Sequence, residues 1–195
     1  MTVPYRVRAL ARTDYPQAGS LLSRRWAREA ECGRPLDQKR DFALIQPLRT
    51  GDHNDELHGL FEDGQLVAMW ELDPTGPGPG WSTSERAENS VGLLLLYTDP
   101  VHRNAGRLVS LWLADQLARH PRPPEWLRYS VTDDRLADHI TRAWGWKKVR
   151  YDNRRHFLQL PCEVKPALRV LITGPVSEQA PSCPSPAPPA RSEHP

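Results

Sequence analysis

A strand–loop–helix–strand pattern in the second half of the chain strongly limits what the chain can fold into. Residues 91 to 98 form an almost continuous apolar run, which is typical of a strand covered on both faces of a sheet. A short basic loop follows, and residues 104 to 119 carry apolar side chains at helical spacing. Residues 126 to 132 then favour a second strand. Because such a crossover joins parallel strands, we expect these two strands to be parallel members of one sheet.

The loop between the first strand and the helix is a candidate anion-binding site. The first N–H groups of a helix have no partner within the helix, and the helix dipole places partial positive charge there. Arg103 and Arg107 add two full charges beside these groups, and Gly106 suits a close backbone approach. The sequence therefore predicts that this loop holds a pyrophosphate. The alternative is that the arginines pair with acidic neighbours or lie in solvent, and that Gly106 is only a turn glycine.

Further periodic segments surround this unit. Asp63-Gly64 between two strand-like runs indicates a tight hairpin turn, and residues 73 to 88 are rich in Pro, Gly and Ser, which favours a long flexible loop. The other expected elements are a strand over residues 5–10, helices between 14 and 33 and over 37–48, hairpin strands over 57–62 and 65–72, a helix from 134 to 143, and strands over 146–150 and 154–160.

Length and composition indicate one domain followed by a tail. The chain has 195 residues, of which 38% are hydrophobic, and this is enough for a single core. The pattern weakens after Pro161, apart from a candidate edge strand at 167–173, and residues 174 to 195 consist largely of Pro, Ser, Ala and Glu. We therefore expect a folded domain over residues 1–161 and a C-terminal extension over 162–195 that is mostly disordered.

Charge and cysteine usage exclude several classes of protein. The 26 basic and 24 acidic residues are interspersed and give a net charge of +2, so we expect no nucleic-acid partner. The first ten residues contain no long apolar run, which argues against a signal peptide and a membrane partner. Three widely separated cysteines suit neither a disulfide framework nor a zinc site. The sequence predicts a cytoplasmic protein with reduced thiols and no metal cofactor.

The order of elements resembles the GNAT superfamily of acyl-CoA-dependent N-acyltransferases over residues 5 to 160. The opening strand followed by Asp14 looks like the family's first strand and helix start. Residues 99 to 108 look like its pyrophosphate loop, and residues 144 to 146, Trp-Gly-Trp, resemble the end of its late helix. The resemblance implies an α/β fold with a mixed, mostly antiparallel twisted sheet, flanking helices and a splayed pair of parallel strands. It also implies acetyl-CoA as the co-substrate.

The resemblance assigns donor binding to the loop and to the end of the strand before it. The family loop reads Arg or Gln, two residues, Gly, one residue, then Gly or Ala. Arg103 and Gly106 fit this pattern, whereas Leu108 stands where the second small residue is expected. The residues expected to bind the donor are Tyr97, Thr98, Arg103, Asn104, Ala105, Gly106, Arg107 and Leu108.

Amine acylation needs a group that takes a proton from the attacking amine. Glu71, late in the second hairpin strand, and Tyr97 are the candidate catalytic residues, and His102 is a third because imidazole titrates near neutral pH. Glu71 as a surface carboxylate and Tyr97 as a packed ring are the alternatives. The family often has a tyrosine four residues before the late glycine, where it protonates the leaving thiolate. Thr141 stands there instead, and its hydroxyl is a poorer acid.

These features together predict an N-acetyltransferase. It would move an acetyl group from acetyl-CoA to a primary amine of a small molecule or peptide, by direct attack in a ternary complex. The alternative is a catalytically inert GNAT-like scaffold that binds a ligand or a partner protein, because Leu108 and Thr141 alter two chemically important positions. A homodimer formed through edge strands is a further expectation that rests on the resemblance.

Overall fold

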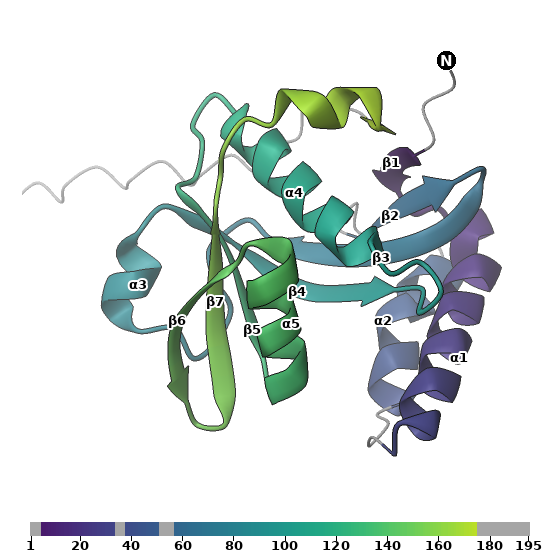
Figure 1. The fold of residues 1–195 in the computed structure, drawn as a ribbon. Helices are drawn as coiled ribbons and strands as arrows, with labels where there is room; N and C mark the ends of the chain where they lie inside the picture. The colour runs from purple at the N-terminus through teal and green to yellow at the C-terminus, as the bar shows by residue number, and fades with distance from the viewer. Residues whose placement is uncertain (1–4, 34–37, 51–56, 175–195) are drawn as a thin grey trace, which may run out of the picture.

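The chain folds around one mixed β-sheet with helices on both faces (Figure 1). The structure, a computed structural model, describes residues 5–33, 38–50 and 57–174. The strands are β1 (Tyr5–Ala9), β2 (Leu57–Glu62), β3 (Gln65–Asp73), β4 (Ser90–Thr98), β5 (Trp126–Val131), β6 (Lys147–Asp152), β7 (Arg155–Pro161) and β8 (Ile172–Thr173). The helices are α1 (Tyr15–Glu31), α2 (Gln38–Thr50), α3 (Thr83–Ala87), α4 (Ala105–Ala118) and α5 (Asp134–Trp144), with 3-10 turns η1 (Arg12–Asp14) and η2 (Pro166–Val170).

The sheet is mostly antiparallel. Its strand order in the described residues is β6-β7-β5-β4-β3-β2-β1-β8, and the parallel pairs are β4 with β5 and β1 with β8. Helix α4 connects β4 to β5, so the predicted strand–helix–strand crossover is confirmed. The predicted hairpin is also confirmed, since Asp63 and Gly64 join β2 to β3 with φ angles of 47° and 82°. The α/β architecture with a mixed, mostly antiparallel sheet is therefore as expected.

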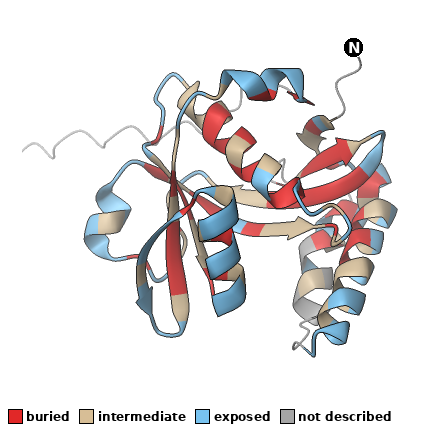
Figure 2. Ribbon diagram, in the orientation of Figure 1, coloured by how far each residue is buried: buried red, intermediate tan, exposed pale blue. Residues whose placement is uncertain are grey.

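Helices cover the two faces of the sheet and create two hydrophobic cores (Figure 2). On one face, α1 and α2 bury residues such as Leu21 and Ile45. On the other face, α4 and α5 bury Trp112 and Ile140. Alternate residues of β4 serve the two cores, as the two-residue period of a strand requires: Leu96 packs with α4 and α5, and Tyr97 packs with α1 and α2.

The segment between β3 and β4, expected to be a long flexible loop, contains helix α3. Ser82 caps this helix, accepting a hydrogen bond from the Glu85 backbone N–H. Trp81 is only 3% exposed and meets the ring of Phe157 edge to face at 5.1 Å. The aromatic side chain thus packs on the sheet and anchors the segment, a long-range contact that loop composition does not reveal.

The chain continues to pack on the domain beyond β7. Leu168 in η2 and Ile172 in β8 are buried, and β8 pairs with β1. The buried carboxylate of Asp115 on α4 accepts hydrogen bonds from the Lys165 backbone and the Arg119 side chain, which holds this segment against the helix. The predicted disordered tail lies, from residue 175 onward, outside the described residues. Within the described ranges, no helix is long and apolar enough to cross a membrane.

Asp14 occupies the N-cap position of α1, yet its side chain makes no capping bond to that helix. Its carboxylate instead accepts two hydrogen bonds from the Arg8 guanidinium, at 2.5 and 2.7 Å, and one from the Ala11 backbone. The bonded guanidinium lowers the pKa of Asp14 below its ordinary value. A bidentate pair to a neighbouring strand therefore replaces the helix cap.

Asp14→Asn is expected to lower the free energy of unfolding at pH 7 by about 1 kcal/mol, a modest figure because Arg8 is partly exposed. The pair stabilises fully above the unfolded-state pKa of about 4, and its contribution is lost as the pH falls through the folded-state pKa. The free energy of unfolding, measured with urea, should therefore decline less steeply between neutral and acid pH in the variant than in wild type. Asp138→Asn, which removes an exposed ion pair with Arg142, is the control. Equal acid dependence of wild type and Asp14→Asn would contradict this account.

Candidate functional site

Strands β4 and β5 separate halfway along β4. They pair from Ser90 with Trp126 to Leu93 with Tyr129, and in the described residues no strand pairs with that edge of β4 beyond Leu93. The register between β3 and β4 shifts at the same place, because Leu72 faces Leu93 while Glu71 faces Leu95. One extra residue of β4 is therefore accommodated there as a bulge, which increases local twist and helps to turn the strand away from β5.

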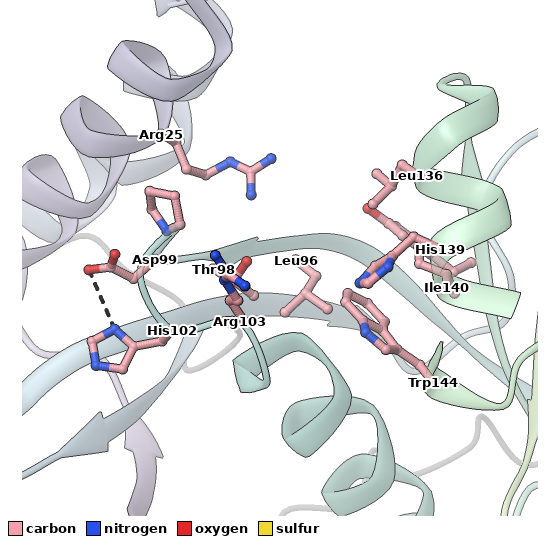
Figure 3. A pocket seen from close by; sticks show the side chains of 12 residues that line it. Arg25, Leu96, Thr98, Asp99, His102, Arg103, Leu136, His139, Ile140 and Trp144 are labelled. Atoms are coloured by element: carbon pink, nitrogen blue, oxygen red, sulfur yellow. Dashed lines mark ion pairs between the residues drawn. The ribbon is translucent and has the colours of Figure 1, made fainter. Parts of the chain in front are cut away.

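A cavity of about 160 Å³ lies where the two strands diverge (Figure 3). Leu96 and Thr98 of β4 form its floor, and Arg103 enters from the loop after β4. His139 and Trp144 of α5 form the opposite wall, with their rings 5.5 Å apart and nearly perpendicular. The cavity therefore combines apolar and cationic walls beside the free edge of a strand.

Helix α4 begins next to this cavity without a side-chain cap. Asn104 occupies the N-cap position and makes no capping bond, unlike Asp133, which caps α5 by accepting from the Leu136 N–H. Within the described ranges, the backbone N–H groups of Gly106 and Arg107 have no hydrogen-bond acceptor. Arg103 and Arg107 are exposed beside them. The arrangement leaves an open, positively charged helix start of the kind that binds phosphate.

The loop that leads into α4 is held by a buried carboxylate. Asp99 is 2% exposed and accepts hydrogen bonds from the Arg24 side chain at 2.8 Å and from the Val101 backbone N–H at 3.0 Å. Arg24 belongs to α1, so this ion pair ties the loop to the helix layer on the other face of the sheet. Such a connection fixes the position of the open helix start before any ligand arrives.

Gly106 provides the close approach between α4 and α5. A Cβ added to it would lie 2.5 Å from Cζ2 of Trp144, so the indole ring packs directly on the first turn of α4. Leu108, which replaces the second small residue of the family pattern, is partly buried against the core under α4. Its bulk is therefore accommodated by core packing.

Gly106→Ala is expected to cost about 1–2 kcal/mol of unfolding free energy, because the new methyl group forces Trp144 from its place. In a Trp144→Ala background, the same substitution is expected to be neutral or slightly stabilising, since alanine favours a helix over glycine. Urea unfolding of the four proteins in this cycle measures the difference. An equal loss in both backgrounds would show that Trp144 does not set the requirement for glycine.

Of the three candidate catalytic residues, Glu71 and Tyr97 lie outside the lining of the cavity, whereas His102 belongs to it. Glu71 is half-buried in β3, opposite Leu95, and Tyr97 points to the other core, where its hydroxyl donates to Asp41 at 2.5 Å. His102 does line the cavity, but its Nε2 lies 2.9 Å from the Glu62 carboxylate. The Tyr97 hydroxyl and His102 Nε2 are therefore each in contact with a carboxylate.

Thr141 bears on the chemistry of the site, whereas Cys162, whose backbone N–H donates to the Glu125 carbonyl before β5, lies at the far end of the strands from the cavity. The Thr141 hydroxyl donates back to the Ala137 carbonyl of its own helix at 3.0 Å, so it is engaged away from a leaving thiolate. Burial raises the pKa of Cys162 to about 12, which keeps this thiol protonated at neutral pH. In the described part of the chain, no group of three or more His, Cys, Asp or Glu side chains is arranged to hold a metal ion.

Sequence reasoning placed the loop arginines correctly beside the helix start but missed the cavity walls. Arg25 of α1 reaches into the cavity, and His139 and Trp144 come from α5. A sequence signal existed for the latter, because Leu136, His139 and Trp144 recur on one face of an amphipathic helix. Nothing in the local pattern around Arg25 distinguishes it from the neighbouring arginine, Arg24, which binds Asp99.

No protein-family model matches the sequence, and a search of curated proteins finds no match either. Solved structures do match. A GNAT-family acetyltransferase from Listeria monocytogenes has a TM-score of 0.58 at 15% identity, covering 83% of this chain and 98% of its own. The PaiA N-acetyltransferase of Thermoplasma acidophilum, in complex with coenzyme A, has a TM-score of 0.56 at 16% identity, covering 83% and 99%.

The Escherichia coli ribosomal-protein-S18-alanine N-acetyltransferase is also similar, with a TM-score of 0.50 at 16% identity over 83% of this chain and 96% of that one. At these identities the likeness shows the fold. It covers 83% of this chain in each of the three comparisons, which agrees with the resemblance seen in the sequence. The chain therefore has the fold of the GNAT acetyltransferases.

Proposed function

We propose that this protein is an N-acetyltransferase that uses acetyl-CoA and acylates a primary amine. The observation that carries the proposal is the open start of α4 beside the free edge of β4. The uncapped N–H groups with Arg103 and Arg107 suit a pyrophosphate, and the unpaired edge of β4 suits an extended amide-containing arm. The coenzyme A in the complex of the Thermoplasma acidophilum neighbour supports the choice of donor.

In this proposal, residues Tyr97 to Leu108 hold the donor. The side chains of Arg103 and Arg107 and the open N–H groups of Gly106 and Arg107 grip the pyrophosphate, with Asn104 and Ala105 forming the turn that presents them, while Tyr97 and Thr98 contribute the strand edge. Leu108 supports the first turn of α4 from the core side. Fixing the donor along β4 places its thioester toward the bulge at Leu94, where backbone N–H groups can stabilise an oxyanion.

The reaction forms a bond between the amine nitrogen and the acetyl carbonyl carbon and breaks the bond from that carbon to sulfur. The amine loses a proton and the departing thiolate gains one. Glu71 and Tyr97 are the proposed catalytic residues, with Tyr97 acting together with its hydrogen-bonded partner Asp41. Because neither lines the cavity, we assign proton transfer from the amine to these groups through water.

The direct test measures binding of CoA and acetyl-CoA by isothermal titration, followed by thiol release in the presence of an amine panel that includes small amines and peptides with free N-termini. Micromolar donor binding with amine-dependent release of CoA would support the proposal. Donor binding without release with any amine would favour the inert scaffold, for which the engaged hydroxyl of Thr141 argues. Absence of donor binding would overturn both the assignment of acetyl-CoA as donor and the proposed acetyltransferase activity.

A further inference from the structure

Arg25 is the cavity residue whose chemistry the donor does not explain. Its side chain is 27% exposed and extends from α1 toward the middle of the cavity, across from His139 and Trp144 (Figure 3). Its contacts among the described residues are a long ion pair with Glu29, at 3.6 Å, and a loose approach to the Tyr97 ring, at 5.4 Å from the centroid. None of these is a hydrogen bond, so the N–H groups of the guanidinium are left for another acceptor.

The charge around Arg25 favours an anionic ligand. Asp99 is the one carboxylate among the described residues that line the cavity, and Arg24 already pairs with it at 2.7 Å. Arg103 adds a second guanidinium to the same cavity. Because Arg103 is assigned to the donor pyrophosphate and Arg24 to Asp99, the charge left to a second ligand is that of Arg25. This charge repels a cationic group, whereas a carboxylate meets a planar donor that can bind it with two parallel hydrogen bonds.

The two arginines come from opposite faces of the sheet. Arg103 precedes α4, which covers one face, and Arg25 belongs to α1, which covers the other and packs with Tyr97. The open N–H groups of α4 are on the side of Arg103. Arg103 and the open N–H groups therefore bind the donor pyrophosphate from the α4 side of the sheet. Arg25 faces the cavity from the α1 side, where the second substrate would bind.

We propose that Arg25 binds a carboxylate of the acceptor, so that the amine substrate is a small amino acid-like molecule carrying both groups. This inference rests on the proposed function and deepens it by naming the class of acceptor. The carboxylate pairs with Arg25, which positions the neighbouring amine toward the free edge of β4. Arg25 is a binding and positioning residue, and it takes no part in proton transfer.

The test compares free amino acids with the matching amino-acid amides, which lack only the carboxylate. Binding is measured by calorimetry to the CoA-loaded protein at about pH 6, where α-amines are protonated. The proteins are wild type, Arg25→Ala, Arg25→Lys and the control Arg28→Ala, which removes an exposed guanidinium one turn along the same helix. CoA affinity is measured separately for each.

We expect wild type and Arg28→Ala to bind at least one free amino acid tenfold or more tightly than its amide. Arg25→Ala should lose this preference while keeping CoA affinity within about twofold, and Arg25→Lys should recover part of it because charge returns without the planar fork. If wild type makes no distinction between acid and amide, or if Arg25→Ala keeps the distinction, the proposal is wrong. It is equally wrong if Arg25→Ala weakens CoA binding tenfold and leaves the preference intact, because Arg25 would then serve the donor.

Failure of the proposed function has a different signature. If wild type binds no CoA, the same acid and amide pairs are titrated into the unloaded protein. A preference for the acid that disappears in Arg25→Ala would still support a carboxylate site at Arg25, whereas the absence of any preference would overturn it.

Discussion

Replacing Arg103 and Arg107 together with alanine is expected to weaken CoA binding about a hundredfold. Both guanidinium groups stand beside the open N–H groups at the start of α4, where a pyrophosphate gains charge-assisted hydrogen bonds. Because both side chains are exposed to solvent, we expect each arginine to contribute about tenfold to CoA affinity, the lower end of the range for charge-assisted hydrogen bonds. Isothermal titration of CoA into wild type and the double variant measures the effect.

The control for this experiment removes two other exposed arginines, Arg12 in η1 and Arg86 in α3, and so changes the net charge equally. Helix α3 precedes the start of β4, whereas the loop with Arg103 follows its end, so Arg86 is distant along the strand. The control variant should bind CoA within about twofold of wild type. Raising the salt concentration should weaken wild-type binding more than binding by the double variant. If the Arg12 and Arg86 control lost as much CoA affinity as the Arg103 and Arg107 variant, the effect would be one of net charge and would not indicate a pyrophosphate site.

Arg128→Ala is expected to lower the free energy of unfolding by about 2–4 kcal/mol, the largest loss of stability that we predict. Arg128 is 2% exposed in the middle of β5. Its guanidinium donates to the Glu85 carbonyl and the Glu88 carboxylate and lies 4.7 Å from the centroid of the Trp81 ring. Truncation leaves a void and releases the segment that carries α3. Urea unfolding followed by tryptophan fluorescence measures the change.

Two variants separate the causes of this loss. Arg128→Met keeps much of the volume but removes the hydrogen bonds, so it should recover only part of the stability. Arg86→Ala, on the exposed side of α3, should stay within about 0.5 kcal/mol of wild type. A loss below about 1 kcal/mol for Arg128→Ala would show that the segment is held mainly by Trp81 and Phe157.

Much of the architecture was predictable because its signals are local. The apolar run of β4, the helical spacing of α4 and the Asp63-Gly64 turn each depend on residues a few positions apart. The same holds for the basic loop at the start of α4. The helix α3 was missed because its signal is a short capping box within a segment rich in Pro and Gly.

The composition of the cavity was not predictable from such signals. The bond between Tyr97 and Asp41 joins residues 56 positions apart, and that between Arg24 and Asp99 joins residues 75 apart. The resemblance placed both Tyr97 and Thr98 near the donor. A strand turns successive side chains to opposite faces, so the Thr98 side chain lines the cavity while the Tyr97 ring packs with α1 and α2. Register and packing therefore decided which member of each neighbouring pair reached the cavity.

The sequence by itself determined the order of the long strands and helices, the parallel crossover and the position of a basic helix start after β4. These features follow from the chain alone because hydrophobic periodicity, turn residues and helix-end residues each signal them within a few positions of sequence. Only the tertiary structure decided that Trp144 packs on Gly106 and that Arg128 is buried. It also decided that Arg24 pairs with Asp99 while Arg25 faces the cavity. These choices depend on the angle at which helices pack on a twisted sheet, which is a property of the whole core.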